Sequence, residues 1–572
     1  MRVDKQRAGL LAVGALAVVP YLVALNAFWV GDDYNYVVPK TLDTILNFWN
    51  PIGRAAYRPT NWLSWALDYT VFGPNPPGWH LTSVAFHVVN TVLVVLLLRE
   101  LARSWWPADP ARGQWLSLTA GALFALHPAH PETVTWTGGR ADLPFATGLF
   151  LAAWALARWR TSGRAHGGFY GLAWLGVWLS IMGKEAGMIT PLALLLVDWA
   201  MPEAPAGSPP APLWRPGDLL RLGRAVLNGA GRVALYLALT AGVLAAQPTP
   251  FALLLGQLLA PALLLIGVPG RGVLRAAPPD GAGRLTRLVR DHVPFLALAG
   301  AYAGMRVVLF LTDHGRLMYG TETHLQVGPG TLIDAAAGYL LLGLGAWEAA
   351  GQVPAWPLLA NAGLVGLGLA IALGAIRRLG RPALFAVLWI PATVLVTFEA
   401  AAARWFYVAS FGVCVLAALA LAEVAATRPR WRILPAVALG LLWGAITVGQ
   451  NSRWVESGEV AQGILAQIRA LHPDPARPAT FYMANPPYSY RGVLLFNSGF
   501  SQAPGYVYQD YRTITGYELQ EHAGQVQAAL ADPAQLGPHP VFLRYEAGRV
   551  REYPSLAALV AAQTQAGGPA GR

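Results

Sequence analysis

The chain has 572 residues, of which 55% are hydrophobic and only 12% are charged. A soluble domain carries roughly 25% charged residues, so this composition excludes an ordinary soluble protein and indicates a membrane protein. The net charge of +11 does not indicate nucleic-acid binding, because the arginines are spread over many short loops and do not form one basic face.

Apolar runs of about 20 residues recur from Leu10 to Gly449, which is the length that a helix needs to cross a bilayer. Arginines are concentrated in every second loop between these runs, as is typical of loops that stay in the cytoplasm. Arg2, Lys5 and Arg7 accordingly place the N-terminus in the cytoplasm. This alternation predicts about 11–13 transmembrane helices in an all-α bundle, with the C-terminus outside.

The first apolar run leads to a long outer loop at 31–78, which is rich in Trp, Tyr and Pro. Within this loop, residues 59–72 predict an amphipathic helix that lies in the membrane interface, with Trp62 and Trp65 at the depth of the lipid headgroups. Among the later membrane helices, the predicted bounds are 79–98, 114–126, a hairpin at 232–268, 356–376, 383–398, 405–424 and 433–450.

A second outer loop is predicted at 312–333. The apolar stretch that follows, 332–350, is predicted to lie in the outer interface or to re-enter the membrane without crossing it. The reason is that the helix at 356–376 has to run inward to reach the arginines at 377–381.

Composition changes at Asn451, where the chain becomes charged and mixed. Strand-like segments at 479–484, 492–496 and 540–545 alternate with helical patterns, which predicts a small α/β domain. The sequence therefore predicts two parts: a transmembrane domain at 1–450, and an extracytoplasmic α/β domain at 451–572.

Polar side chains gather at the outer ends of several predicted helices. A charge in the middle of a span costs about 2.5–3.5 kcal/mol, so a cluster confined to one membrane face indicates a functional site. Its members are Asp32, Asp33, His80, His87, His127, His130, Glu132, Arg140, Asp142, Lys184, Glu185, Arg404 and Tyr407.

Each member also has a structural interpretation. Asp32 and Asp33 could be solvated or could cap a helix, and His87 could form a hydrogen bond between helices. Lys184 and Glu185 could form an ion pair that fixes a helix end. The functional interpretation is favoured because five separate helices place such groups on the same face.

A metal site is not expected. His127, His130 and Glu132 have ligand chemistry, but a proline-rich turn seldom holds a preformed site. Cys414 is the single cysteine, which excludes a cysteine-based metal site or a disulfide framework. We therefore predict no cofactor.

Several strings together resemble a known family. They are D-D-Y at 32–34, Y-R-P-T-N-W-L-S-W-A-L-D-Y at 57–69, L-H-P-A-H-P-E-T-V-T-W-T-G-G-R-A-D-L at 126–143, G-K-E-A-G-M-I-T-P-L-A-L-L-L-V-D-W at 183–199, A-R-W-F-Y-V-A-S-F-G-V at 403–413 and N-S-R-W at 451–454. The sequence resembles the integral membrane glycosyltransferases of the GT-C fold, most closely the transmembrane and tetratricopeptide-repeat O-mannosyltransferases and their bacterial relatives. The resemblance covers most of 1–200 and about 390–455. The chain departs from the family in carrying the α/β domain where eukaryotic members have repeats.

The resemblance implies transfer of mannose or another hexose from a polyprenyl-phosphate donor to an acceptor hydroxyl on the outer face of the plasma (inner) membrane. It implies an inverting single displacement, in which the acidic pair of the first outer loop supplies the base. We assign that role to Asp33, with Asp32 as the alternate. The implied partners are the lipid-linked donor, a protein or glycan acceptor and membrane lipids.

The departing phosphate needs positive charge beside it. The candidates for that role are Arg140, Lys184, Arg404 and Arg58. The candidates for orienting donor or acceptor are His80, His130, Glu132, Asp142, Glu185 and Tyr407.

Two alternatives remain. One is a GT-C enzyme that modifies a lipid or a surface glycan in place of a protein. The other is a transporter or flippase of lipid-linked sugars, although such proteins often show inverted repeats and midplane sites, neither of which the sequence indicates.

Overall fold

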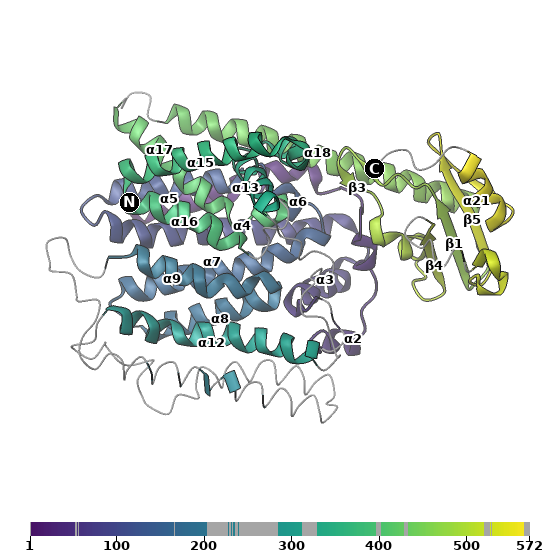
Figure 1. The fold of residues 1–572 in the computed structure, drawn as a ribbon, viewed down its shortest axis with the longest axis horizontal. Coiled ribbons are helices and arrows are strands. Elements are labelled where there is room, and N and C mark those ends of the chain that lie inside the picture. Colours follow the sequence, from purple (N-terminus) through teal and green to yellow (C-terminus); the bar gives the residue numbers. More distant parts are fainter. Residues whose placement is uncertain are drawn as a thin grey trace.

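The computed structural model consists of a bundle of helices followed by a small sheet domain (Figure 1). It describes residues 2–51, 54, 56–164, 166–202, 284–311, 329–395, 402–427, 433–519 and 529–565, with isolated positions at 223, 227, 230, 231, 233, 234, 238 and 527. The predicted hairpin at 232–268 and most of the predicted loop at 312–333 lie outside the described residues.

Proline begins four successive helices in the first part of the chain. It suits the first helical position because its fixed φ is helical and its missing N–H would have no partner there. These helices are α3 (Pro59–Phe72), α4 (Pro76–Trp105), α5 (Pro110–Ala125) and α6 (Pro131–Val134). Before them lie α1 (Arg2–Leu16), the 3-10 helices η1 (Val19–Ala24) and η2 (Asp33–Asn35), and α2 (Leu42–Asn47).

The remaining helices of the bundle are interrupted by four short 3-10 helices in the part of the chain that the structure describes. They are η3 (Gly138–Ala141), α7 (Asp142–Thr161), α8 (Gly167–Gly183), η4 (Glu185–Ile189), α9 (Thr190–Ala200), α12 (Arg284–Leu311), α13 (Pro329–Gly343), α14 (Trp347–Gln352), η5 (Val353–Ala355), α15 (Leu358–Leu379), α16 (Arg381–Val394), η6 (Ala403–Phe406), α17 (Ser410–Thr427) and α18 (Leu434–Leu471).

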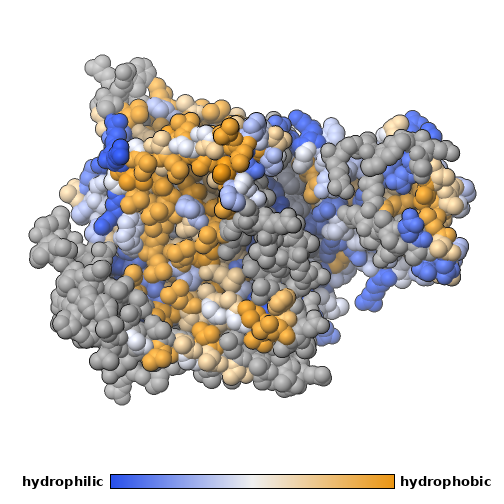
Figure 2. All heavy atoms as spheres, in the orientation of Figure 1, coloured by the Kyte–Doolittle hydropathy of each residue, from blue (hydrophilic) through white to orange (hydrophobic). Residues whose placement is uncertain are grey.

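Five helices of the described part are long and apolar enough to cross a membrane: those at Gln6–Ala24, Pro76–Trp105, Arg290–Leu311, Leu358–Leu379 and Leu434–Leu471. The apolar window of α15 is only 6% buried inside the protein, and Leu359 is 87% exposed. A helix that presents apolar side chains outward needs lipid around it. Figure 2 shows the corresponding hydrophobic band over the bundle. The chain is a multi-pass membrane protein.

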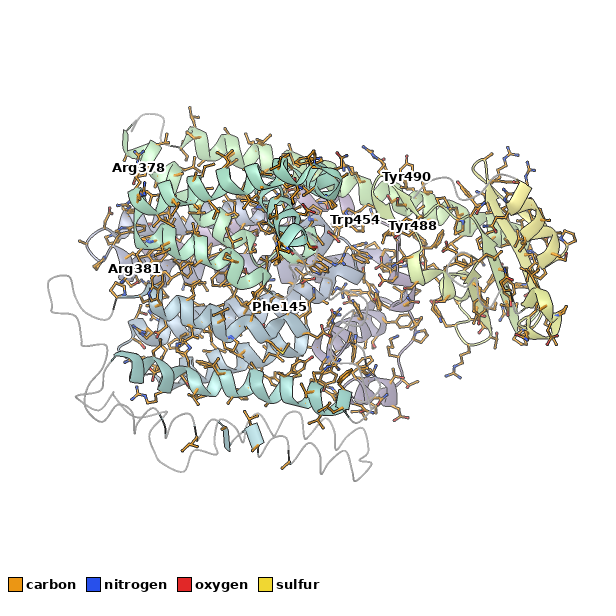
Figure 3. All side chains as sticks on the ribbon, viewed as in Figure 1. Phe145, Arg378, Arg381, Trp454, Tyr488 and Tyr490 are labelled. Carbon is orange, nitrogen blue, oxygen red and sulfur yellow. The ribbon has the colours of Figure 1, made fainter. Side chains whose placement is uncertain are left out.

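The two ends of the bundle differ in charge. Arg112 pairs with Glu423 at 3.3 Å, and Arg99 donates to the backbone carbonyl of Gln6, so arginine-rich turns gather at the end that carries the N-terminus. Figure 3 places Arg381 at this same end and the α/β domain beyond the opposite end. We call that opposite end, which carries the predicted site residues, the site end.

The segment after 328 enters the bundle and returns to the same end. A Cβ on Gly330 would lie near Leu358 at the start of α15, whereas Leu340 lies 2.8 Å from the Cβ position of Gly368, midway along α15. The chain then returns through Gly345, beside a proline of the loop that follows α5. The predicted re-entry of 332–350 agrees with this path. The predicted loop end at 329–333 is wrong, because Pro329 already begins α13.

Helix α3 has the predicted bounds. Trp65 is only 5% exposed and stacks on Tyr36, with ring centroids 3.8 Å apart. Trp65 is therefore covered by protein, and its predicted depth at the lipid headgroups stays a prediction. Its ring packs against the chain segment that carries Asp32 and Asp33.

One continuous helix joins the bundle to the α/β domain. Helix α18 has 38 residues, so the composition change at Asn451 lies within one continuous helix and marks a change in the surroundings of that helix.

The main sheet has the order β4 (Ile514–Glu518), β1 (Ala479–Ala484), β5 (Pro540–Glu546) and β6 (Arg549–Tyr553). Strand β1 is parallel to both of its neighbours, and β6 is antiparallel to β5.

Smaller elements complete this domain: the two-stranded sheet of β2 (Ser489–Tyr490) and β3 (Val493–Leu494), η8 (Asn497–Ser501), α19 (Ala503–Tyr508), η9 (Pro533–Gln535) and α21 (Leu556–Gln565). The predicted fold class, a helical membrane bundle followed by a small α/β domain, is confirmed.

Helices α7 and α8 pack backbone to backbone, and this contact generates a stability prediction. A Cβ on Gly176 would lie 2.6 Å from the backbone nitrogen of Ala152, whereas a Cβ on Gly171 of the same helix has nothing within 4 Å. Gly176→Ala should therefore destabilise the bundle by about 1–3 kcal/mol through overpacking. Gly171→Ala should be neutral or stabilising, because alanine favours helix. Thermal unfolding of both variants in detergent measures the difference, and equal melting temperatures would contradict the packing.

Candidate active site at the site end

Asp33 joins two loops through its carboxylate. Its Oδ2 accepts a hydrogen bond from the backbone N–H of Val30 at 3.2 Å, and its Oδ1 accepts one from the backbone N–H of Gly138 at 2.8 Å. The side chain is buried, and burial followed by the charge of Asp32 raises its pKa well above the usual value. Both oxygens are thus engaged by the protein.

Asp32, the preceding residue, has one carboxylate oxygen without a hydrogen-bond partner. Its Oδ2 accepts from the hydroxyl of Tyr36 at 2.8 Å, but its Oδ1 is buried without a hydrogen-bond partner. Burial raises the pKa of Asp32, while the Tyr36 hydrogen bond and the charges of Arg404 and Arg58 lower it. A buried acceptor without a partner is costly, so it marks a place where a ligand could donate.

Three ion pairs link loops of the site end, and two of them contain the arginines whose charges act on Asp32. The three pairs are Arg58 with Glu185 (Nε–Oε2 2.9 Å), Lys184 with Asp142 (Nζ–Oδ1 2.6 Å) and Arg404 with Glu132 (2.5 Å). The two arginines also interact electrostatically with carboxylates outside their own pairs: Arg58 with Asp142, and Arg404 with both Asp142 and Asp32. These seven side chains, which we call the charge cluster, carry one more negative than positive charge.

The three cations differ in how open they are. The side chains of Arg58 and Arg404 are 23% and 31% exposed, whereas that of Lys184 is 9% exposed and is held by both oxygens of Asp142. Burial lowers the pKa of Lys184. Burial also acts to lower the pKa of both arginines, but their paired glutamates together with Asp142 and other acidic neighbours outweigh it and raise each pKa. Arg58 and Arg404 are therefore the permanently charged groups that an incoming anion could reach.

Arg140 lies apart from this cluster, in a fully buried ion pair with Asp68. Its Nε donates to the hydroxyl of Ser83 at 2.9 Å, and its remaining nitrogen donates to the backbone carbonyl of Trp79 at 2.6 Å. Every guanidinium nitrogen thus has a protein partner. Arg140 connects η3 to α3 and α4, and it is not placed to bind a donor phosphate.

The predicted orienting residues separate into two groups. Glu132, Asp142 and Glu185 belong to the charge cluster, where each holds a cation. The other three are packed inside the bundle: His80, which contacts a backbone carbonyl, His130 and Tyr407. Because all three of these side chains are buried among helices, they are not placed to contact a substrate.

The α/β domain fixes the backbone that carries the acidic pair. The N–H of Gly31 donates to the carbonyl of Leu495 at 2.8 Å. A Cβ on Gly499 would lie 2.1 Å from the Gly31 carbonyl oxygen and 3.1 Å from the Cα of Asp32, so only glycine permits this approach. Gly31 itself has a φ of +62°, which favours glycine. Sequence reasoning did not find Gly499, because nothing local indicates a contact across more than 460 residues.

Sequence reasoning also missed Tyr36 and Arg453. Tyr36 follows the D-D-Y string by two residues and binds Asp32 directly. Arg453 lies in N-S-R-W and lines a cavity beside Glu132. Both residues are in or next to family-like strings, which was the available signal. In the part of the chain that the structure describes, no group of three or more His, Cys, Asp or Glu is arranged to hold a metal ion.

Comparison with known proteins gives relatives of one kind. The chain is 38% identical over 162 residues to protein O-mannosyl-transferase Tmtc1 of Drosophila melanogaster and 32% identical over 204 residues to Tmtc2 of the same organism. The chain is similar to protein O-mannosyl-transferases. The resemblance predicted from the sequence strings is thereby confirmed. These matches cover 26% and 32% of this chain but only 18% and 20% of the relatives, and no protein-family model matches.

Among solved structures, the archaeal oligosaccharyltransferase AglB from Archaeoglobus fulgidus, in complex with an inhibitory peptide and a dolichol-phosphate, aligns with a TM-score of 0.41. The identity is 15%, and the alignment covers 89% of this chain and 64% of that chain.

The buried pair of Arg140 and Asp68 generates a prediction about stability. Asp68→Asn should destabilise the protein by about 3–5 kcal/mol, because it leaves the Arg140 charge buried without its partner. The double variant Asp68→Leu with Arg140→Met should recover part of that loss. Thermal unfolding in detergent measures both. Glu423→Gln, which breaks the half-exposed pair with Arg112, is the control and should cost no more than about 1 kcal/mol. A fully stable Asp68→Asn protein would show that the pair is not structural.

Proposed function

We propose that the protein is a glycosyltransferase that moves mannose from a polyprenyl-phosphate donor to an acceptor hydroxyl at the site end. The observation that carries the proposal is the partnerless buried oxygen of Asp32, held beside Arg58 and Arg404. A carboxylate that can take a proton and cations that can hold a phosphate are the two groups that this reaction needs. The names of the similar proteins support mannose as the sugar and a protein hydroxyl as the acceptor.

The proposed reaction is a single displacement. The acceptor oxygen forms a bond to the anomeric carbon as its proton passes to Asp32, while the bond from that carbon to the phosphate oxygen breaks. The electron pair of the broken bond leaves with the phosphate. Because phosphate is a good leaving group, the reaction needs no second carboxylic acid, unlike the two-carboxylate glycoside hydrolases.

Arg58 and Arg404 are the proposed phosphate ligands. A guanidinium can bind phosphate oxygens in a bidentate way, which suits the anion that develops as the bond breaks. In the proposed complex the donor phosphate competes with Glu185 and Glu132 for these arginines. Lys184 is more enclosed, and its proposed role is to stabilise the site indirectly, through its ion pair with Asp142. This scheme supplies the positive charge from side chains and uses no metal.

The geometry favours Asp32 over Asp33 as the base, which reverses the preference that the resemblance suggested. Asp33 has both oxygens occupied by backbone N–H groups, so its proposed role is to hold the loop at Gly138 in place. A general base has to come within hydrogen-bond reach of the proton that it takes, and only Asp32 has an oxygen available for that.

The proposed orientation places the site end outside the plasma (inner) membrane. Sugar nucleotides are made in the cytoplasm, so a site on the outer face needs a sugar that a lipid carrier has already brought across. The arginine-rich turns at the opposite end of the bundle support a cytoplasmic location for that end.

The deciding test compares Asp32→Asn with wild type. Purified protein in detergent receives polyprenyl-phosphate mannose and cell extract as acceptor, and the release of polyprenyl phosphate is measured. Release should fall by roughly 10²-fold or more in the variant, since the general base is lost. Asp43→Asn is the matched control, because Asp43 is exposed in the same loop and should leave release unchanged.

Two results would overturn this proposal. Equal release by wild type and Asp32→Asn would move the base elsewhere, with Asp33 tested next. No release from mannose or glucose donors by well-folded wild type would favour a transporter of lipid-linked sugars, for which transport into vesicles is the next measurement.

The pH dependence of release tests the surroundings of Asp32. Activity requires the carboxylate form, so the rate should fall as pH drops through the pKa of Asp32, which burial raises. Tyr36→Phe removes a hydrogen bond to the carboxylate and should raise that pKa further, so the acidic limb of the profile should move to higher pH. Tyr508→Phe, which removes a hydroxyl that contacts His472 in the α/β domain, should leave the profile in place. An unchanged profile in Tyr36→Phe would contradict the assignment.

A further inference from the structure

A cavity of about 600 Å³ lies between the bundle and the α/β domain. Its polar lining comes from four places: Glu132 in α6, Gln352 at the end of α14, Arg453 on α18, and Arg491 in the turn between β2 and β3. The proposed reaction assigns no role to this space.

The cavity touches the charge cluster at one point. Glu132 lines the cavity and at the same time pairs with Arg404, whose charge acts on Asp32. A molecule bound in the cavity would therefore lie one ion pair away from the proposed base.

The β2–β3 hairpin presents aromatic and basic side chains next to this cavity. Tyr488 and Tyr490 are 66% and 41% exposed, and Figure 3 shows both near Trp454, between the bundle and the main sheet. The turn places Arg491 and Gly492 at positive φ, as tight hairpin turns require. Exposed tyrosine and arginine are enriched at protein–protein interfaces, so the hairpin has the composition of a surface that binds polypeptide.

The charges around the cavity favour an anionic ligand. Among the lining residues that the structure describes, Arg453 and Arg491 are basic and come from two different parts of the protein, and the acidic one, Glu132, is already held by Arg404. Arg491 pairs with Glu456, but both side chains are more than a third exposed, so this pair is easily exchanged for another carboxylate.

We propose that this cavity binds the acceptor, and that the acceptor is a polypeptide segment with acidic residues beside the hydroxyl that receives the sugar. This inference rests on the proposed function and specifies its substrate. Arg453 and Arg491 pair with the acidic side chains, while the tyrosines of the hairpin contact the extended chain.

The test measures peptide binding to the purified full-length protein in detergent. Three fluorescent serine- and threonine-containing peptides differ only in their flanking residues, which are glutamate, glutamine or lysine. The glutamate peptide should bind at least about tenfold more tightly than the glutamine peptide, and Arg453→Gln with Arg491→Gln should remove that preference. Arg551→Gln is the matched control, because Arg551 is 66% exposed on β6 and does not line the cavity.

Arg491→Gln alone guards against misfolding, since this residue is at an exposed turn, and it should weaken binding of the glutamate peptide in the same direction. In the transfer assay the double variant should raise KM for the glutamate peptide. Equal binding of the three peptides, or a preference that survives in the double variant, would overturn the proposal. If wild type binds the glutamate peptide but never releases polyprenyl phosphate, the proposed transferase function fails and the binding site stands.

Discussion

The cost of burying charge governs the site end of this protein. Charged side chains that leave water have to be paired, and here each pair joins two loops that are distant in sequence. Arg58 with Glu185 joins the first long loop to η4, and Arg404 with Glu132 joins η6 to α6. The loops thus hold one another through their charges. Two members of these pairs, Arg58 and Arg404, act through their charges on Asp32.

The net charge of the charge cluster determines which residues can bind an anion. The charge cluster has one more negative than positive charge, so a phosphate gains little from the cluster as a whole and has to be held by particular arginines. Arg58 and Arg404 are the more exposed members and keep their charge at any physiological pH, since each pKa is raised overall. A protonated Asp32 would make the cluster neutral. Proton transfer to Asp32 and retention of the leaving phosphate therefore support each other electrostatically, as a reaction that releases both a proton and a phosphate requires.

The sequence was sufficient to predict many helices and strands, but not the contacts between their side chains. Composition and arginine alternation were sufficient to predict a helical membrane bundle, and Pro59 to Phe72 marks α3 because proline and glycine delimit it. Strand β1 follows from a short β-favouring run. The pairing of Arg140 with Asp68 does not follow from sequence, since nothing local distinguishes a buried arginine from one that faces a substrate. The choice between Asp32 and Asp33 likewise depends on which backbone N–H groups lie nearby, and that information exists only in three dimensions.

The α/β domain is the part of the chain about which the sequence indicated least, yet it packs directly against the backbone of the proposed base. Helix α18 continues from the membrane into this domain without a break, so the domain is held rigidly and not through a loose linker. Gly499 then packs on Gly31 and Asp32 at a distance that no side chain would allow. The same domain also supplies Arg491 to the adjoining cavity. A ligand that moved the β2–β3 hairpin would thus act on a domain whose backbone also sets the position of Asp32, which gives this fold a direct physical route from acceptor binding to the geometry of the reaction.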